Sequence, residues 1–122
     1  RWALRDRDAD RRWVEGRVVL LGDAAHPVPP FLAQGAALAL EDAVVLARRV
    51  GDGRAPKAAL TAYAAARRPR AARVLAASRR NAFAFHAGGL TAWAGQTALR
   101  AVGGLWLPRS LDWLYGYDIE EV

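Results

Sequence analysis

The chain has 122 residues and no cysteine, which excludes a disulfide scaffold and a thiolate metal site. Its net charge of +6 comes mainly from arginines in Ala-rich stretches, a pattern that indicates a solvated helix face rather than a surface that binds nucleic acid; examples are positions 67, 68, 70, 73, 79 and 80. No segment reaches the ~18 consecutive apolar residues of a membrane span and no signal peptide opens the chain, so we expect a cytoplasmic protein.

Two short stretches near the N-terminus predict strands. Residues 2–6 alternate between apolar and polar side chains, which is typical of a half-buried strand. Residues 18–21 are wholly apolar and are bounded by Gly22, which predicts a strand buried on both faces in a parallel sheet. Because two strands alone do not make a stable sheet, we expect the chain to be the C-terminal piece of a larger protein whose earlier residues supply the other strands.

A proline-rich loop and a helix follow. Prolines 27, 29 and 30 forbid both a helix and a strand ladder. A helix is predicted from about Gln34, with a regular pattern over residues 36–50, and Gly51 and Gly53 end it. Its polar residues share one narrow face and the rest of its circumference is apolar, so we expect it to be buried.

The remainder of the chain is predicted to be helical. A second helix begins at Pro56, and Pro69 is expected to kink or restart it before it continues to about His86. A third, weaker helix is predicted over residues 90–102, and the aromatic tail, residues 111–118, is expected to pack on the body of the protein. The chain is therefore predicted to be mostly α-helical with one or two short strands.

A strand, a small-residue turn, a proline-fixed loop and a helix start together indicate a nucleotide cofactor site. Asp23 lies at the carboxyl end of the predicted strand, where its carboxylate can accept hydrogen bonds from two ribose hydroxyls. The backbone N–H groups of residues 34–37 are free at the helix start and favour negative charge on a bound ring system. We expect His26 to make a structural hydrogen bond, and Glu41 and Asp42 to pair with arginines.

The residues of this stretch resemble the second flavin motif of the FAD-dependent aromatic hydroxylases, the class A flavoprotein monooxygenases. The matching positions are Gly22-Asp23-Ala24-Ala25-His26, Pro30, Ala33-Gln34-Gly35 and Glu41-Asp42-Ala43. Residues 31–35 and 113–118 are most similar to the salicylate and hydroxybenzoate hydroxylase branch. The resemblance implies an α/β, Rossmann-like FAD-binding fold for the intact family.

The resemblance also implies roles for individual residues. Asp23 would bind the FAD ribose, Pro30 would lie beside the isoalloxazine, and the backbone of residues 33–37 would receive its pyrimidine carbonyl. The implied cofactor-binding residues are Gly22, Asp23, Ala24, Pro30, Ala33, Gln34, Gly35, Ala36 and Ala37. The implied reaction is hydroxylation of a small aromatic acid or phenol with FAD, NAD(P)H and oxygen.

The same resemblance divides the chain into three parts. Residues 1–10 would be the last strand of a substrate domain, residues 11–53 the C-terminal part of the FAD-binding domain, and residues 54–122 the C-terminal helices and tail. The GxGxxG motif that binds the ADP pyrophosphate is absent from this sequence, so the expected partner is the missing N-terminal part of the FAD domain. The chain alone is predicted to show no turnover and weak or no FAD binding, and no metal ligand or catalytic base is predicted within it.

Two other interpretations stay open at this point. The chain is also compatible with a relative that uses the flavin fold for epoxidation or another oxidation. From a different class of protein, a non-catalytic remnant or a helical interaction module would retain the motif without the activity.

Overall fold

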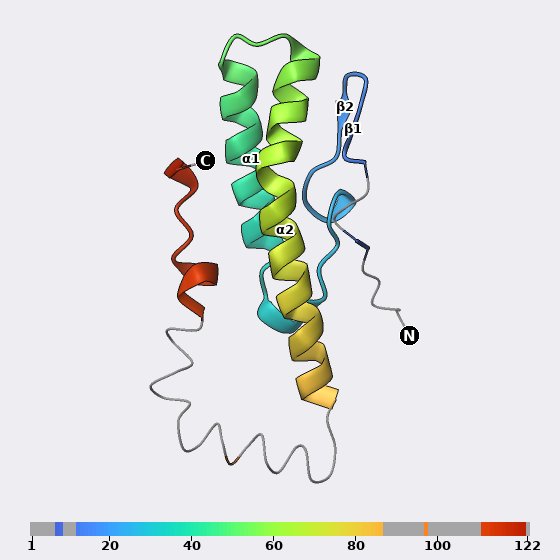
Figure 1. The fold of residues 1–122 in the computed structure, drawn as a ribbon, viewed down its shortest axis with the longest axis vertical. Coiled ribbons are helices and arrows are strands. Elements are labelled where there is room, and N and C mark those ends of the chain that lie inside the picture. The colour runs from blue at the N-terminus through green and yellow to red at the C-terminus, as the bar shows by residue number, and fades with distance from the viewer. Residues whose placement is uncertain (1–6, 9–11, 87–96, 98–110, 122) are drawn as a thin grey trace.

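The computed structural model describes residues 7–8, 12–86, 97 and 111–121. Two long helices, α1 (Gly35–Gly51) and α2 (Pro56–His86), run side by side in opposite directions, and a small hairpin lies next to them (Figure 1). The described residues are therefore mostly helical with two short strands, as the sequence predicts. The expected strand at residues 2–6 lies outside the described residues, as does the third helix apart from Thr97.

The hairpin joins β1 (Val14–Glu15) and β2 (Val18–Val19) through a tight turn at Gly16, whose φ is 59°. The two strands pair antiparallel, with Val14 opposite Val19 and Glu15 opposite Val18. The prediction of a parallel strand buried on both faces is wrong for the described part of the chain, where Val18 is 65% exposed. The physical reason is that β1 is the only other strand in that part, so β2 pairs with it across the turn.

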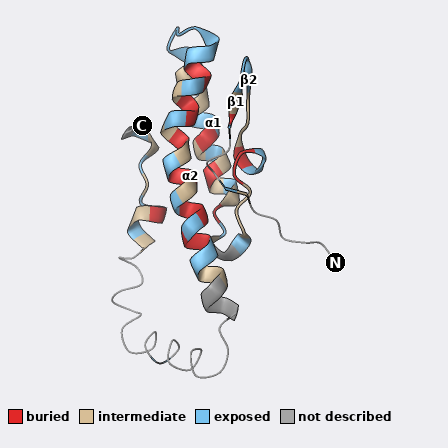
Figure 2. Ribbon diagram, turned by 45° about the vertical axis from the view of Figure 1, so that its right-hand side comes forward, coloured by how far each residue is buried: buried red, intermediate tan, exposed pale blue. Residues whose placement is uncertain are grey.

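Helix α1 is buried on one face only. Leu38, Asp42 and Val45 recur at the spacing of a single helix stripe and are fully buried. Leu40 is 70% exposed on another face, and Val44 and Val50 are exposed as well. The prediction that this helix is buried around most of its circumference is therefore wrong for the described residues, because α2 and the C-terminal residues cover only part of it (Figure 2).

Helix α2 runs without interruption for 31 residues and contains Pro69 in its interior. Of the two outcomes expected at Pro69, a kink or a restart of the helix, the restart is wrong. Pro69 lies on the exposed face, where water can satisfy the carbonyl that loses its backbone donor. Small buried residues such as Ala64 and Ala71 let α2 approach its neighbours closely.

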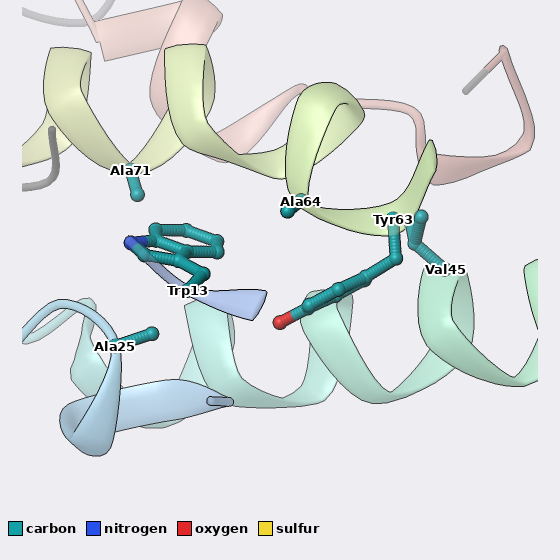
Figure 3. Packing of buried hydrophobic residues seen from close by; sticks show 6 residues of the cluster. All are labelled: Trp13, Ala25, Val45, Tyr63, Ala64 and Ala71. Atoms are coloured by element: carbon teal, nitrogen blue, oxygen red, sulfur yellow. The ribbon is translucent and has the colours of Figure 1, made fainter. Parts of the chain in front are cut away.

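The core consists of two clusters. In the first, Trp13 lies between the side chains of Ala25 and Ala71 and contacts Tyr63 with a ring separation of 6.2 Å (Figure 3). In the second, Leu38 of α1, Val74 of α2 and Leu114 of the tail pack together, which confirms that the aromatic tail packs on the body. None of the described helices combines the length and the apolar character needed to cross a membrane.

Candidate functional site

The turn after β2 brings the first motif residues against α1. Gly22 opens the 3-10 turn η1 (Gly22–Ala24) with a φ of 56°, a conformation that favours glycine. A methyl group at this position would also lie 3.2 Å from the Cβ of Ala39 in α1. The carbonyl of Gly22 accepts hydrogen bonds from the N–H groups of Ala25 and His26, both at 2.9 Å. Glycine is therefore required both by the backbone conformation and by the close approach of α1.

Asp23 lies at the exposed side of this turn. A methyl group built on Gly35 would be 3.7 Å from the Oδ1 atom of Asp23, so the carboxylate sits beside the first residue of α1. Ala24, the next residue, is also exposed. The turn and the helix start, which are separated by the proline loop in sequence, are thus adjacent in space.

The proline loop ends in a second 3-10 turn, η2 (Pro30–Leu32). Its exit residue, Ala33, adopts a left-handed conformation with φ 51° and ψ 30°, which is uncommon for a residue other than glycine. The hydroxyl of Ser78 in α2 donates a 2.7 Å hydrogen bond to the carbonyl of Pro29. The loop that presents the exposed Pro30 is therefore attached to α2 through the carbonyl of Pro29.

The N-terminus of α1 is not capped by a side chain. Its N-cap residue, Gln34, makes no side-chain capping hydrogen bond, and the first helical bond runs from the N–H of Leu38 to the carbonyl of Gln34 at 2.9 Å. The N–H groups of residues 35–37 consequently have no partner within the helix. With the positive end of the helix dipole behind them, they favour an anionic or carbonyl oxygen from a ligand.

A buried carboxylate connects the turn to both helices. Asp42, on α1, is fully buried, and its Oδ2 atom accepts hydrogen bonds from the N–H of Gly22 at 3.1 Å and from Nε2 of His26 at 2.6 Å. Its Oδ1 atom accepts a hydrogen bond from Nε of Arg67 at 2.7 Å. Burial alone would raise the pKa of Asp42, but the bonds from His26 and Arg67 outweigh it and the pKa is lowered.

Glu41 extends the network to the outside of the helix pair. It accepts hydrogen bonds from Arg67 at 2.6 Å and from Arg70 at 3.1 Å. Burial disfavours the charge of Arg67, but the two carboxylates more than compensate and its pKa is raised. The predictions that Glu41 and Asp42 pair with arginines, and that His26 makes a structural hydrogen bond, are confirmed.

Two of the arginines that the sequence analysis places on a solvated helix face are buried. Arg67 is fully buried and Arg70 is 7% exposed, so the prediction of a solvated face is wrong for both. The signal that could have found them is their spacing: Arg67 and Arg70 follow Tyr63 and Ala64, which belong to the same buried stripe of α2. A charge on such a stripe needs an acidic partner, and the adjacent Glu41 and Asp42 supply it. The structure does not describe the side chain of His86, the last residue of α2.

Comparison with known proteins shows the family of the chain. A family model described as an FAD binding domain matches residues 1–78. The chain belongs to the FAD-binding domain family of the class A flavoprotein monooxygenases.

Two curated relatives illustrate the relationship. The chain is 45% identical over 128 residues to 3-hydroxybenzoate 6-hydroxylase 1 of Aquipseudomonas alcaligenes, covering 99% of this chain and 31% of that protein. It is 45% identical over 119 residues to 3-amino-4-hydroxybenzoate 2-monooxygenase of Streptomyces cremeus, covering 95% of this chain and 29% of that protein. The chain thus spans about a third of the length of these relatives.

A solved structure supports the same fold. HpxO of Klebsiella pneumoniae, crystallised in complex with FAD, matches this chain with a TM-score of 0.80 and 33% sequence identity. The match covers 88% of this chain and 28% of HpxO. The fold of this chain is therefore one that occurs in an FAD-bound member of the family.

The described residues fit the family's cofactor. Asp23 presents an exposed carboxylate, and the backbone of Gly35 beside it carries no side chain. The uncapped N–H groups of residues 35–37 offer donors to a ring carbonyl at the same place. A carboxylate acceptor and a set of N–H donors consequently lie next to each other. In the described part of the chain, no group of three or more histidines and carboxylates is arranged to hold a metal ion.

Proposed function

We propose that this chain forms the flavin-contacting C-terminal part of an FAD-dependent monooxygenase that hydroxylates a small aromatic acid or phenol. The observation that carries the proposal is the juxtaposition of the Asp23 carboxylate with the uncapped N-terminus of α1. The sugar of FAD requires a group that accepts hydrogen bonds from its two hydroxyls, which a carboxylate can do. The ring of FAD requires donors for its carbonyl oxygens, which a row of N–H groups supplies.

In this proposal, each part of the site has one task. Asp23 accepts hydrogen bonds from the FAD ribose, while Gly22 and Ala24 leave room for the cofactor to lie against the chain. Pro30 lies beside the isoalloxazine, and the N–H groups of the stretch from Ala33 to Ala37 donate to its pyrimidine edge. FAD, when bound, supplies the redox chemistry with electrons from NAD(P)H. The chain's own contribution is to orient the ring and to stabilise negative charge on it, because preorganised donors cost no reorganisation when the charge develops.

The substrate class follows from the relatives. Two relatives that match nearly the whole chain are named for 3-hydroxybenzoate and 3-amino-4-hydroxybenzoate, which are both aromatic acids with a ring hydroxyl. We infer a substrate of this class for the complete flavoprotein. The rest of the relatives' length would supply the pyrophosphate site, the substrate pocket and any catalytic base.

Replacement of Asp23 tests the cofactor role in the complete flavoprotein. Asp23→Ala should lower the FAD content of the purified protein and abolish NAD(P)H oxidation in the presence of a hydroxybenzoate. Asp52→Ala is a matched control, because Asp52 is an exposed carboxylate at the other end of α1. If Asp23→Ala retained its flavin and its activity, the assignment of the site would be wrong.

A second experiment tests whether the chain alone suffices. Titration of the 122-residue chain with FAD should show weak or no binding, because the ADP half of the cofactor site is not in this sequence. A saturable complex at micromolar concentration, detected by quenching of flavin fluorescence, would contradict the proposal that the chain supplies only part of the site.

A further inference from the structure

The C-terminal segment, residues 111–117, lies against the helix pair although it is distant in sequence from every motif residue (Figure 1). Its central residue, Leu114, is 2% exposed and packs with Leu38 of α1 and Val74 of α2. Val28 and Leu32, which belong to the proline loop, pack against the same cluster. One apolar residue of the segment thus belongs to a cluster that includes both the loop and the start of α1.

Arg70 donates hydrogen bonds to the backbone of the C-terminal segment. Its Nη1 and Nη2 atoms each donate a 2.9 Å hydrogen bond, to the carbonyls of Trp113 and Leu114 respectively. These carbonyls lie in a single helical turn, whose last C=O groups lack helical partners. The guanidinium also lies 4.0 Å from the centre of the Tyr117 ring and is itself paired with Glu41. The segment is therefore held by a guanidinium that is almost fully buried and is bonded at the same time to Glu41.

The presence of Leu38 in the same cluster connects the C-terminal segment to the start of α1. Leu38 directly follows Ala37, and its N–H makes the first helical hydrogen bond of α1, to the carbonyl of Gln34. A shift of Leu38 would therefore tilt the N–H groups of residues 35–37 just before it. A shift of Leu32 would likewise move the turn that contains Pro30.

We propose that the C-terminal segment is a positioning element of the flavin site, with Leu114 and Arg70 as its positioning residues. This inference rests on the proposed function of the stretch from Gly22 to Ala37. Neither residue belongs to that stretch: Leu114 lies in the cluster that contains Leu38 of α1 and is bordered by Val28 and Leu32 of the proline loop, and Arg70 holds the backbone of Leu114. The N–H donors are thereby kept in one orientation toward the flavin ring, which preorganised stabilisation of charge requires.

The test uses the complete flavoprotein saturated with FAD and compares Leu114→Ala with Leu60→Ala. Leu60 is also a buried leucine, and it lies in the first turns of α2 at the opposite end from Val74 and the C-terminal segment. Both variants lose a core side chain, so both should unfold at a lower temperature. Leu114→Ala alone should change the visible absorbance spectrum and reduction potential of the bound flavin and weaken FAD binding about tenfold.

Arg70→Lys provides a second, independent test of the proposal. Lysine keeps the charge but cannot donate to Trp113, Leu114 and Glu41 together, so the same spectral and potential changes should appear in milder form. They should be larger in Arg70→Ala. These variants keep Leu114 itself, so the test stands even where Leu114→Ala fails to fold.

Two outcomes would overturn the proposal. One is a flavin spectrum and potential unchanged in all three variants; the other is an equal change in Leu60→Ala, which would follow from general destabilisation. If Asp23→Ala abolishes FAD binding while the variants of the C-terminal segment leave the flavin unchanged, this inference fails and the proposed function stands. If Asp23→Ala is also without effect, the proposed function fails first.

Discussion

The Nε atom of Arg67 donates a hydrogen bond to the Oδ1 atom of Asp42 at 2.7 Å, and both side chains are fully buried. The other oxygen of the same carboxylate holds the N–H of Gly22 and the ring of His26. One ion pair thus connects α2 to the turn that presents Asp23. Because removal of Arg67 would leave the buried carboxylate of Asp42 without its guanidinium partner, the pair is a sensitive point of the fold.

Removal of Arg67 should destabilise the chain strongly. Arg67→Ala removes the guanidinium that pairs with both Asp42 and Glu41, so Asp42 keeps only Gly22 and His26 as donors among the described residues and Glu41 keeps Arg70. The substitution should lower the free energy of unfolding by about 3–5 kcal/mol. Arg67→Lys should recover only part of this loss, because lysine cannot serve both carboxylates with a planar fork. Chemical denaturation followed by tryptophan fluorescence measures the difference. Arg80→Ala, on the exposed face of the same helix, is the control and should stay within about 0.5 kcal/mol of the parent chain.

The lowered pKa of Asp42 predicts a loss of stability in acid. A carboxyl whose folded-state pKa lies below its ordinary value of 3.8 contributes stability that is fully present above that value. This contribution is lost as the pH falls through the folded-state pKa. Urea denaturation between about pH 2 and pH 6 should therefore show a falling midpoint at the acid end, and Asp42→Asn should flatten this dependence.

Asp52→Asn is the matched control for the acid experiment, since Asp52 is exposed and its ion pairs with Arg49 and Arg54 are long, at 3.8 Å each. It should keep the steep acid limb of the parent chain. An equal flattening by both substitutions would show that the acid sensitivity is a property of the net charge rather than of the buried carboxylate.

Gly22 and Gly53 allow backbone strain to be separated from close packing. Both have positive φ, 56° and 69°, but a methyl group would meet Ala39 at 3.2 Å only from Gly22. Gly53→Ala should therefore cost about 1–2 kcal/mol for the left-handed conformation alone. Gly22→Ala should cost more and should also weaken FAD binding in the complete flavoprotein. Equal losses of unfolding free energy in the two variants would contradict the structural role assigned to the contact with Ala39.

Local patterns were sufficient to predict the turns and the helix start of the candidate site, but not the contacts that hold them. The turn at Gly22, the proline loop and the start of α1 near Gln34 follow from residue types whose backbone preferences act over a few positions. The pairing of Glu41 and Asp42 with arginines was also predicted, although their partners lie on another helix. The sequence does not show which arginines pair with these two carboxylates, because the burial of Arg67 depends on how α1 and α2 pack.

The wrong predictions concern residues whose burial depends on how other segments of the same chain pack against them. The apolar run at Val18 reads as a buried strand, and the apolar circumference around Leu40 reads as a buried helix, yet both are exposed in the described residues. Periodicity reports how apolar a face is and carries no information on what covers it. The sequence also cannot show that the helix continues through Pro69 rather than restarting there, since the cost of a proline in a helix depends on whether the freed carbonyl reaches water.

The left-handed conformation of Ala33 predicts a substitution of the opposite sign. At a φ of 51°, alanine bears a steric cost that glycine avoids, so Ala33→Gly should raise the free energy of unfolding by up to about 1 kcal/mol. Ala47→Gly, in the exposed middle of α1, is the control and should lower it by about 1 kcal/mol, because glycine there only adds freedom to the unfolded chain. Denaturation of the two variants side by side measures both signs. A loss of stability in Ala33→Gly would mean that the Ala33 methyl group makes a packing contact whose value exceeds the backbone strain.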